Sequence, residues 1–322
     1  MKAYVYGANG AEITDVAKPT PKGTQVLVRV RSCGLNRADL GMTKGHAHGS
    51  AGGGGAVLGM EWAGEIAEVG PEAKGVKAGD KVMGSGAAAF AEYALADHGR
   101  LFRAPSNMNF EEAATLPVAL ATMHNAVVTN GALQPGQSVL IQGASSGVGL
   151  MAMQIAKLKG AKLVIGSSTD AARRGRLKDF GADLAVDSSD PGWVDQVLKA
   201  TAGEGVDLIV DQVSGKVASQ NLAATKIKGR IVNVGRLGGT HADFNFDLHA
   251  ARRINYIGVT FRTRSIEEIR EIFDEVRKDI WPAVESRKLQ LPIDKVFAFD
   301  DIGKAFAHME ANRHLGKIVV TL

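Results

Sequence analysis

The chain has 322 residues, of which 45% are hydrophobic and 22% charged, with 38 Lys and Arg against 34 Asp and Glu. These proportions are typical of a soluble globular protein, and at roughly 150 residues per domain the length predicts two domains. The mild, dispersed excess of positive charge does not indicate nucleic-acid binding, and no apolar run approaches the roughly 20 residues that span a membrane. Cys33 is the single cysteine, which excludes an internal disulfide and a cysteine-based zinc site.

Residues 1–118 are predicted to form short strands separated by turns. Residues 1–6 have the pattern of a strand and not of a secretory signal, so a cytoplasmic protein is expected. Residues 25–31 alternate as a half-buried strand does, and short apolar stretches follow at 64–69 and 80–83. Many short strands with glycine turns predict a compact, barrel-like β domain.

Residues 45–55 are too rich in glycine for a regular element, and they are predicted to form a flexible loop. The loop carries His46 and His48 without further obvious ligands. At most adventitious metal binding is expected there, so no metal site is predicted.

Residues 119–262 have a different character, because apolar strands now alternate with helical patterns. The strands are predicted at 138–142, 162–166, 184–186, 206–211, 230–235 and 255–261, and the helices near 148–159, 170–180, 192–201 and 215–225. Such alternation predicts a parallel sheet covered by helices on both faces, the doubly wound α/β architecture that binds dinucleotides.

A glycine turn, Gly-Ala-Ser-Ser-Gly-Val-Gly at residues 143–149, joins the first of these strands to its helix. Small residues let the backbone approach a pyrophosphate, which the helix N-terminus then attracts. Similar turns occur in short-chain dehydrogenases, which use a Tyr-x-x-x-Lys pair. That interpretation is rejected because none of the tyrosines has a lysine four residues later; they are Tyr4, Tyr6, Tyr93 and Tyr256.

The cofactor is predicted from the end of the second strand. Ser168 stands where NAD-binding turns usually carry an acidic residue, and Arg173 follows. Hydroxyls with a nearby arginine suit a 2′-phosphate, so NADP(H) is favoured over NAD. The alternative is that Arg173, Arg174 and Arg176 form an ordinary solvated helix face.

Residues 263–322 return to mixed character. Ser265 is predicted to cap an amphipathic helix, and a strand at 295–299, a helix near 301–311 and a strand at 317–321 follow. These elements are expected to rejoin the first domain, which makes residues 119–262 an insertion.

A series of short segments follows one order along the whole chain: residues 33–39, 59–65, 75–82, 90–93, 111–117, 143–149, 229–235 and 314–319. In this order they resemble the medium-chain dehydrogenase/reductase superfamily, and specifically its zinc-free, zeta-crystallin-like quinone oxidoreductases. The resemblance implies an α/β protein with a GroES-like β-barrel catalytic domain, residues 1–118 and 263–322, around a Rossmann domain, residues 119–262. It also implies a homodimer through the edge strand near Asn255–Phe261.

The resemblance also bears on metal use. Zinc alcohol dehydrogenases of this superfamily place Cys where this chain has Asn36 and His where it has Met60. An amide and a thioether do not replace a thiolate and an imidazole, so zinc-independent chemistry is expected. Cys33 is expected to be a core residue.

Carried over residue by residue, the resemblance places Asn36 and Thr122 beside the nicotinamide. Further cofactor contacts are implied for Ser146, Gly147 and Val148 at the pyrophosphate, Ser167 and Arg173 at the 2′-phosphate, Gly235 over the cofactor and Asn312 at the adenine end. Two alternatives remain open: Asn36 caps a helix through Asp39, or Thr122 bonds only within its own helix. His46 stands where family members often carry a tyrosine.

Two reactions and one non-catalytic role are compatible with these residues. The first is reduction of a quinone by NADPH, in which hydride leaves nicotinamide C4 and a proton comes from water, His46 or His48. The second is reduction of the double bond of an enone, with His46 as the nearest donor to the developing enolate. The third is NADPH binding without turnover. The first reaction, with Asn36, His46 and Thr122 as catalytic residues, is the primary hypothesis.

Overall fold

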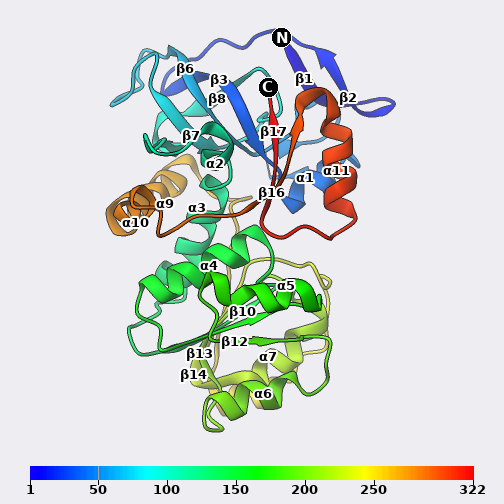
Figure 1. Cartoon of the computed structure of the whole chain (residues 1–322), viewed down its shortest axis with the longest axis vertical. Helices are drawn as coiled ribbons and strands as arrows, with labels where there is room; N and C mark the ends of the chain where they lie inside the picture. The colour runs from blue at the N-terminus through cyan, green and yellow to red at the C-terminus, as the bar shows by residue number, and fades with distance from the viewer. Residues whose placement is uncertain (50) are drawn as a thin grey trace. The chain divides into compact units, whose positions relative to one another are not determined.

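The computed structural model describes residues 1–49 and 51–322, which form two compact units (Figure 1). One unit comprises Met1–Ala121 and Phe261–Leu322, and the other comprises Thr122–Thr260. Blue, cyan, orange and red segments make up the first unit in Figure 1, and green and yellow segments make up the second.

A seven-stranded sheet organises the first unit. Its strands are β16 (Ile293–Ala298), β17 (Lys317–Thr321), β3 (Gln25–Gly34), β6 (Glu61–Val69), β7 (Lys81–Ser85) and β9 (Leu101–Arg103), in this order, and β8 (Tyr93–Asp97) pairs with β3. Strand β17 runs antiparallel to β3, with Val319 opposite Gly34 and Val320 opposite Cys33. The prediction that the C-terminal segment rejoins the N-terminal one is therefore confirmed.

Smaller elements complete this unit. They are the hairpin β1 (Lys2–Gly7) and β2 (Gly10–Asp15), the helices α1 (Arg37–Met42), α2 (Phe110–Ala113), α9 (Ile266–Asp279), α10 (Trp281–Glu285) and α11 (Ile302–Glu310), and the short turns η1 (His98–Arg100) and η5 (Phe299–Asp301). Helix α3 (Pro117–His124) begins in this unit, and its last three residues belong to the second. Helix α9 begins as predicted, because the Ser265 hydroxyl accepts from the Glu268 N–H and the Glu268 carboxylate accepts from the Ser265 N–H.

The core of this unit is formed by buried side chains of the seven-stranded sheet, packed against side chains of β1 and α11. Tyr4 stacks on Phe306, with 5.7 Å between ring centroids, and Trp62 is fully buried. Cys33 has no exposed surface, and its thiol donates to the Ala89 carbonyl at 3.0 Å. Its predicted place in the core is confirmed.

The glycine-rich segment contains regular structure that the sequence did not indicate. Strands β4 (Ala47–His48) and β5 (Ala51–Gly52) pair antiparallel, so the prediction that no regular element forms here was wrong. Ser50, between these strands, lies outside the described residues. Gly45 has φ +85°, and a Cβ there would come within 2.8 Å of the Tyr6 ring. Glycine here lets the chain turn against an aromatic side chain.

A six-stranded, all-parallel sheet organises the second unit. Its strands are β12 (Leu184–Val186), β11 (Leu163–Ser167), β10 (Ser138–Gln142), β13 (Val206–Asp211), β14 (Thr225–Asn233) and β15 (Asn255–Gly258), in this order. The first strand in sequence lies at the centre, with later strands added on either side. This is the doubly wound order, in which the end of the first strand faces a ligand crevice, and the predicted fold class is confirmed.

The connections are η2 (Asn125–Asn130, a π-helical turn), α4 (Gly147–Leu158), α5 (Ala171–Arg176), η3 (Leu177–Phe180), α6 (Trp193–Ala200), η4 (Gly215–Val217), α7 (Ala218–Ala224) and α8 (Phe246–Arg252). Helix α8 was not predicted from the sequence. Its signal was Asn245, whose side chain accepts from the Leu248 N–H at 2.9 Å. Strand β14 begins before the predicted 230, and β15 ends before the predicted 261.

Candidate functional site

Asn36 in the first unit is held by two buried charged residues. It lies between β3 and α1, where its amide nitrogen donates to Glu61 Oε2 at 3.0 Å and to the Gly34 carbonyl at 3.3 Å. Lys317 Nζ donates to Asn36 Oδ1 at 2.9 Å. Both amide donors of Asn36 are therefore used, and its Oδ1 accepts from Lys317.

Glu61 and Lys317 form a buried ion pair that sequence reasoning did not identify. Their side chains are 0% and 6% exposed, and Nζ lies 2.5 Å from Oε2. The other oxygen, Oε1, accepts from the Val118 N–H at 2.7 Å. A lysine beginning the otherwise apolar strand β17 was the available signal, since a buried lysine needs an acidic partner.

Asn36, Glu61 and Lys317, called the Asn36 cluster below, can lie this close together because residue 34 is a glycine. A Cβ at this position would lie 2.3 Å from the Ala114 carbonyl and 2.9 Å from Glu61 Oε2. Any side chain at Gly34 would therefore displace Glu61 or the backbone of the neighbouring segment.

Asp39 is a second buried carboxylate beside this cluster. Its Oδ2 accepts from the Asn36 backbone N–H at 2.7 Å, whereas Oδ1 is buried and has no hydrogen-bond partner among the described residues. Burial raises the pKa of Asp39 from 3.8 to about 7; the Asn36 N–H and Lys317 oppose this rise, and Glu61 adds to it. As the alternative predicted, Asn36 is the N-cap of α1 and forms a capping box with Asp39. Its side-chain amide also bonds to both members of the ion pair.

His46, the candidate proton donor, lies on the hairpin segment after α1. It is exposed, and its backbone N–H donates to the Gly41 carbonyl at 3.0 Å. The sequence has no tyrosine in this segment, but Tyr6 from β1 packs against Gly45 next to His46. The Tyr6 side chain therefore places a phenol beside Gly45, although the two residues are far apart in the sequence. This contact was not predicted from the sequence.

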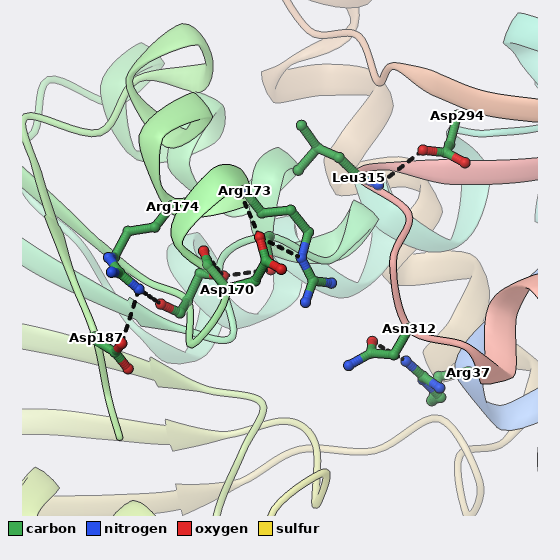
Figure 2. Close-up of polar contacts among 10 residues, drawn as sticks. Arg37, Asp170, Arg173, Arg174, Asp187, Asp294, Asn312 and Leu315 are labelled. Carbon is green, nitrogen blue, oxygen red and sulfur yellow. Dashed lines mark hydrogen bonds and ion pairs between the residues drawn. The ribbon is translucent and has the colours of Figure 1, made fainter. Parts of the chain in front are cut away.

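Asn312, predicted at the adenine end of the cofactor, follows α11. Its Oδ1 accepts from Arg37 Nη2 at 2.7 Å, as Figure 2 shows. Nearby, the Leu315 N–H donates to Asp294 Oδ1 at 3.2 Å. These hydrogen bonds hold the segment between α11 and β17. The Asn312 carbonyl oxygen is used as an acceptor, and its amide nitrogen stays available as a donor.

The glycine turn of the second unit is built by its own small residues. Gly143 has φ +74°, and a Cβ at Gly149 would lie 2.6 Å from the Gly143 carbonyl. The Ser146 hydroxyl accepts from the Gly149 N–H at 3.1 Å and lies 2.9 Å from both the Gly143 carbonyl and Gln212 Oε1. Ser146 is thus the N-cap of α4, and Gly147 and Val148 form its first turn.

A buried polar network supports this turn from behind. The Ser167 hydroxyl donates to Gln142 Oε1 at 2.6 Å and accepts from the Gly143 N–H at 3.0 Å. Ser167 has no exposed surface, so in this conformation its hydroxyl positions the turn. Gln212 Nε2 is buried and has no hydrogen-bond partner among the described residues, which leaves an amide donor beside the turn.

The arginines after β11 have acidic partners. Asp170 caps α5, with Oδ1 accepting from the Arg173 N–H at 2.8 Å and lying 3.6 Å from Arg173 Nε. Arg174 donates to the Ser168 carbonyl at 2.8 Å and to Asp187 Oδ2 at 3.0 Å (Figure 2). The Arg173 N–H bond is the main cause that lowers the pKa of Asp170. The two guanidinium groups that follow β11 are therefore each close to a carboxylate.

Gly235 and Thr122 are the remaining candidates in this unit. A Cβ at Gly235 would lie 2.6 Å from the Gln212 carbonyl, so only glycine fits there without a shift. Thr122 lies in α3 and is partly exposed. Its hydroxyl makes no hydrogen bond to the described residues, so the alternative of a bond within its own helix is not observed.

The residues of the second unit fit a dinucleotide. The turn offers close backbone approach at Gly143 and Gly149, the start of α4 offers N–H groups, and Gln212 offers an unused buried donor. Within residues 1–49 and 51–322, no three His, Cys, Asp or Glu side chains gather closely enough to hold a metal ion. None of the helices described there is long and apolar enough to cross a bilayer.

Two family models match the chain. Residues 22–106 match the alcohol dehydrogenase GroES-like domain, and residues 147–278 match the zinc-binding dehydrogenase family. Human quinone oxidoreductase is 29% identical over 277 residues, which cover 83% of this chain and 82% of that protein. A phenolphthiocerol/phthiocerol polyketide synthase of Mycobacterium tuberculosis is 28% identical over 310 residues, or 96% of this chain. The match spans only 14% of that synthase.

Solved structures similar to this chain include an alcohol dehydrogenase superfamily protein and an enoyl reductase. An alcohol dehydrogenase superfamily protein from Novosphingobium aromaticivorans has a TM-score of 0.88 at 30% identity, covering 100% of this chain and 99% of that chain. The CurK enoyl reductase has a TM-score of 0.87 at 25% identity, covering 99% of both chains. With both family models matching in the expected order, the chain belongs to the medium-chain dehydrogenase/reductase superfamily of oxidoreductases, whose members bind a nicotinamide cofactor.

Proposed function

We propose that the protein is a zinc-independent, NADPH-dependent quinone oxidoreductase. The observation that carries the proposal is the Asn36 cluster, where the superfamily's zinc ligands are replaced by an amide and Met60. An amide held by Glu61 and Lys317 orients a ligand by hydrogen bonding instead of polarising it as a metal does. Similarity to human quinone oxidoreductase over most of both chains supports the choice of acceptor.

The cofactor is proposed to contact residues that lie at or near the ends of strands and helices. Ser146, Gly147 and Val148 would meet the pyrophosphate, Arg173 the 2′-phosphate with Ser167 behind it, Gly235 the adjoining turn, and Asn312 the adenine end. Asn36 Oδ1 would accept from the nicotinamide carboxamide, and the unbonded Thr122 hydroxyl would provide a second contact.

When bound, NADPH supplies the hydride. The chain's part is to orient the acceptor and to deliver one proton for each quinone reduced to hydroquinone. Water, the exposed His46 imidazole or the partly exposed His48 imidazole is proposed as the proton source, because an imidazole can donate a proton as a general acid. Tyr6 is a further hydroxyl at this segment.

A second candidate is reduction of an enone or enoyl double bond. It is favoured by the similarity to CurK enoyl reductase and to a polyketide synthase. Reduction at carbon requires a proton donor for the developing enolate, for which His46 is the candidate. NADPH binding without turnover is the third candidate.

Turnover measurements separate these functions. NADPH oxidation is followed with 1,4-benzoquinone and 9,10-phenanthrenequinone, and in parallel with trans-2-hexenal as an enone-type acceptor. We expect turnover with quinones to exceed turnover with the enal. Preference for the enal supports the reductase alternative, and NADPH binding without oxidation on any acceptor supports the non-catalytic one. Asn36→Ala is expected to lower kcat, with Asn107→Ala, an exposed side chain bonded to the Glu285 carbonyl, as the matched control.

We also propose a homodimer formed through β15. This strand is the edge of the parallel sheet, and Tyr256 on it is 37% exposed. An edge strand with exposed apolar side chains favours pairing with a second copy. Light scattering after size exclusion is expected to give twice the chain mass, and Tyr256→Lys is expected to shift it toward the monomer.

A further inference from the structure

A pocket of about 340 Å³ lies in the first unit apart from the Asn36 cluster. Its lining comes from the residues preceding and beginning β3, the end of β7 with its following loop, the end of β8 and the start of α9. Its polar members are Thr24, Gln25, Ser85, Asp97 and Arg100. Asn36, His46 and Lys317 do not line it.

Arg100 is a cation without a partner in this pocket. No hydrogen bond or ion pair of its guanidinium is found among residues 1–49 and 51–322, and its Nε is buried. Burial lowers the pKa of Arg100, against the influence of Asp97, but an arginine remains protonated at neutral pH. A half-buried guanidinium with unused donors is costly unless an acceptor satisfies it.

Asp97 is not a hydrogen-bond partner of Arg100, because its carboxylate is bonded to Arg270. Arg270 donates from Nε to Asp97 Oδ1 at 2.9 Å and from Nη2 to Oδ2 at 2.6 Å. Thr24 donates to Oδ2 at 2.7 Å, and the Gly99 N–H donates to Oδ1 at 2.9 Å. Although burial opposes the change, these bonds lower the pKa of Asp97 to about 2. Asp97 is thus bonded to Arg270, and Glu267 also lies within electrostatic reach of Arg270 and Asp97. The Arg100 guanidinium, by contrast, has no hydrogen-bond partner among the described residues.

Other polar groups in the pocket are also donors. The Ser85 side chain is nearly buried, at 8% exposure for the residue, and its hydroxyl bonds to none of the described residues. Gln25 uses its carbonyl oxygen to accept from the Lys22 N–H at 3.1 Å, which leaves its amide nitrogen as a donor. A guanidinium, a hydroxyl and an amide nitrogen together present donors to an anion.

A neighbouring pocket that is also lined by arginines provides a comparison. That pocket, of about 410 Å³, is lined by Arg103, Arg270 and Arg277. Arg277 donates to the Gly99 and Leu101 carbonyls, and Arg103 donates to the Gly75 carbonyl at 3.1 Å. All three arginines there have protein acceptors, whereas Arg100 has none among the described residues.

We propose that the Arg100 pocket binds the carboxylate or phosphate group of a small acidic molecule, with Arg100 as the anchoring cation and Ser85 and Gln25 as further donors. A guanidinium matches both oxyanions in a two-bond geometry. The pocket volume lies near the lower limit of small-molecule sites, roughly 300–1,000 Å³, so the ligand is a small one. This site is separate from the proposed NADPH contacts, and its test does not depend on catalysis.

The test measures binding of inorganic phosphate and of acetate to the full chain by calorimetry, with NADPH saturating so that Arg173 is not the site observed. Chloride at matched ionic strength is the reference. We expect one phosphate or acetate site, weakened about tenfold or more by Arg100→Gln and less by Ser85→Ala. Arg103→Gln, which removes an exposed arginine that already has a protein acceptor, is the matched control and is expected to bind as the wild type does.

Two results would overturn the proposal: wild-type binding no stronger than for chloride, or equal loss in Arg100→Gln and Arg103→Gln. Unchanged NADPH affinity shows that Arg100→Gln is folded. If that variant does not fold, Arg100→Lys, which keeps the charge and loses the two-bond geometry, takes its place. It is expected to lose affinity for phosphate, and full retention by both Arg100→Lys and Ser85→Ala would exclude the site.

Discussion

The two units hold their candidate residues by different physical means. In the first, Asn36 is fixed by a buried ion pair between Glu61 and Lys317, and Asp39 is buried beside it. In the second, the glycine turn is fixed by neutral hydroxyls and amides and by the absence of side chains at Gly149. The first arrangement is sensitive to charge and pH, whereas the second is sensitive to volume.

This difference suits the two tasks. A buried ion pair holds an amide in one orientation, because any rotation would leave a charge unsatisfied. A phosphate-binding turn instead needs free N–H groups and room for the ligand, which a protein charge would occupy. Four substitutions test the contrast, and they are described from the largest expected effect to the smallest.

Lys317→Met is expected to have the largest effect. Removing the lysine leaves the Glu61 carboxylate buried without a counter-charge, which costs about 3–5 kcal/mol of unfolding free energy. Urea unfolding measures this change. Lys304→Met is the matched control, because Lys304 is 75% exposed where it pairs with Asp301, and exposed pairs contribute about 0–1 kcal/mol. Adding Glu61→Gln to Lys317→Met is expected to restore part of the loss, and equal stability of the wild type and Lys317→Met would show that the pair is unimportant.

Asp39→Asn is expected to change how stability depends on pH. The pKa of Asp39 is raised from 3.8 to about 7 in the folded chain, so the folded state binds more protons than the unfolded state between these values. Unfolding free energy therefore falls as pH rises from about 4 to about 7, by up to about 4 kcal/mol for this one group. The wild type minus Asp39→Asn difference, measured by urea unfolding at several pH values, is expected to show this fall. A flat difference over that range would contradict the raised pKa.

Gly149→Ala is expected to damage the second unit through volume alone. The added Cβ would lie 2.6 Å from the Gly143 carbonyl, and overfilling of this kind costs about 1–3 kcal/mol. NADPH affinity is expected to fall with stability, as followed by thermal unfolding and nucleotide titration. Gly175→Ala is the control, because nothing lies within 4 Å of its added Cβ. There the change is expected to add about 0.5–1 kcal/mol, since alanine favours a helix over glycine.

Arg173→Gln is expected to have the smallest effect on folding and a selective effect on the cofactor. If Arg173 meets the 2′-phosphate, affinity for NADPH falls roughly tenfold while affinity for NADH is nearly unchanged. Arg176→Gln is the control, because Arg176 is 59% exposed and pairs with Asp179. Equal losses for both nucleotides would assign Arg173 to the α5 cap with Asp170 and leave NADPH preference without this support.

Local patterns in the chain were sufficient for much of the fold. The strands 138–142, 184–186 and 206–211 were predicted with the bounds the structure shows, because buried parallel strands are continuous apolar runs. The glycine turn and the Ser265 cap were also predicted from the sequence, because each depends on residues only a few positions away. Helix α8 and the short β4–β5 hairpin were missed, because each is brief and depends on contacts outside its own pattern.

The polar contacts of the site were decided by tertiary structure. Glu61 and Lys317 are separated by 256 residues and meet only because β17 pairs with β3 beside β6. Tyr6 reaches Gly45 from another strand, and Ser167 turns inward to brace Gly143 instead of outward. A periodic pattern shows which side of an element is buried, but it does not show which buried side chain finds which partner. That choice follows from strand order and register, and it is made when the sheet assembles.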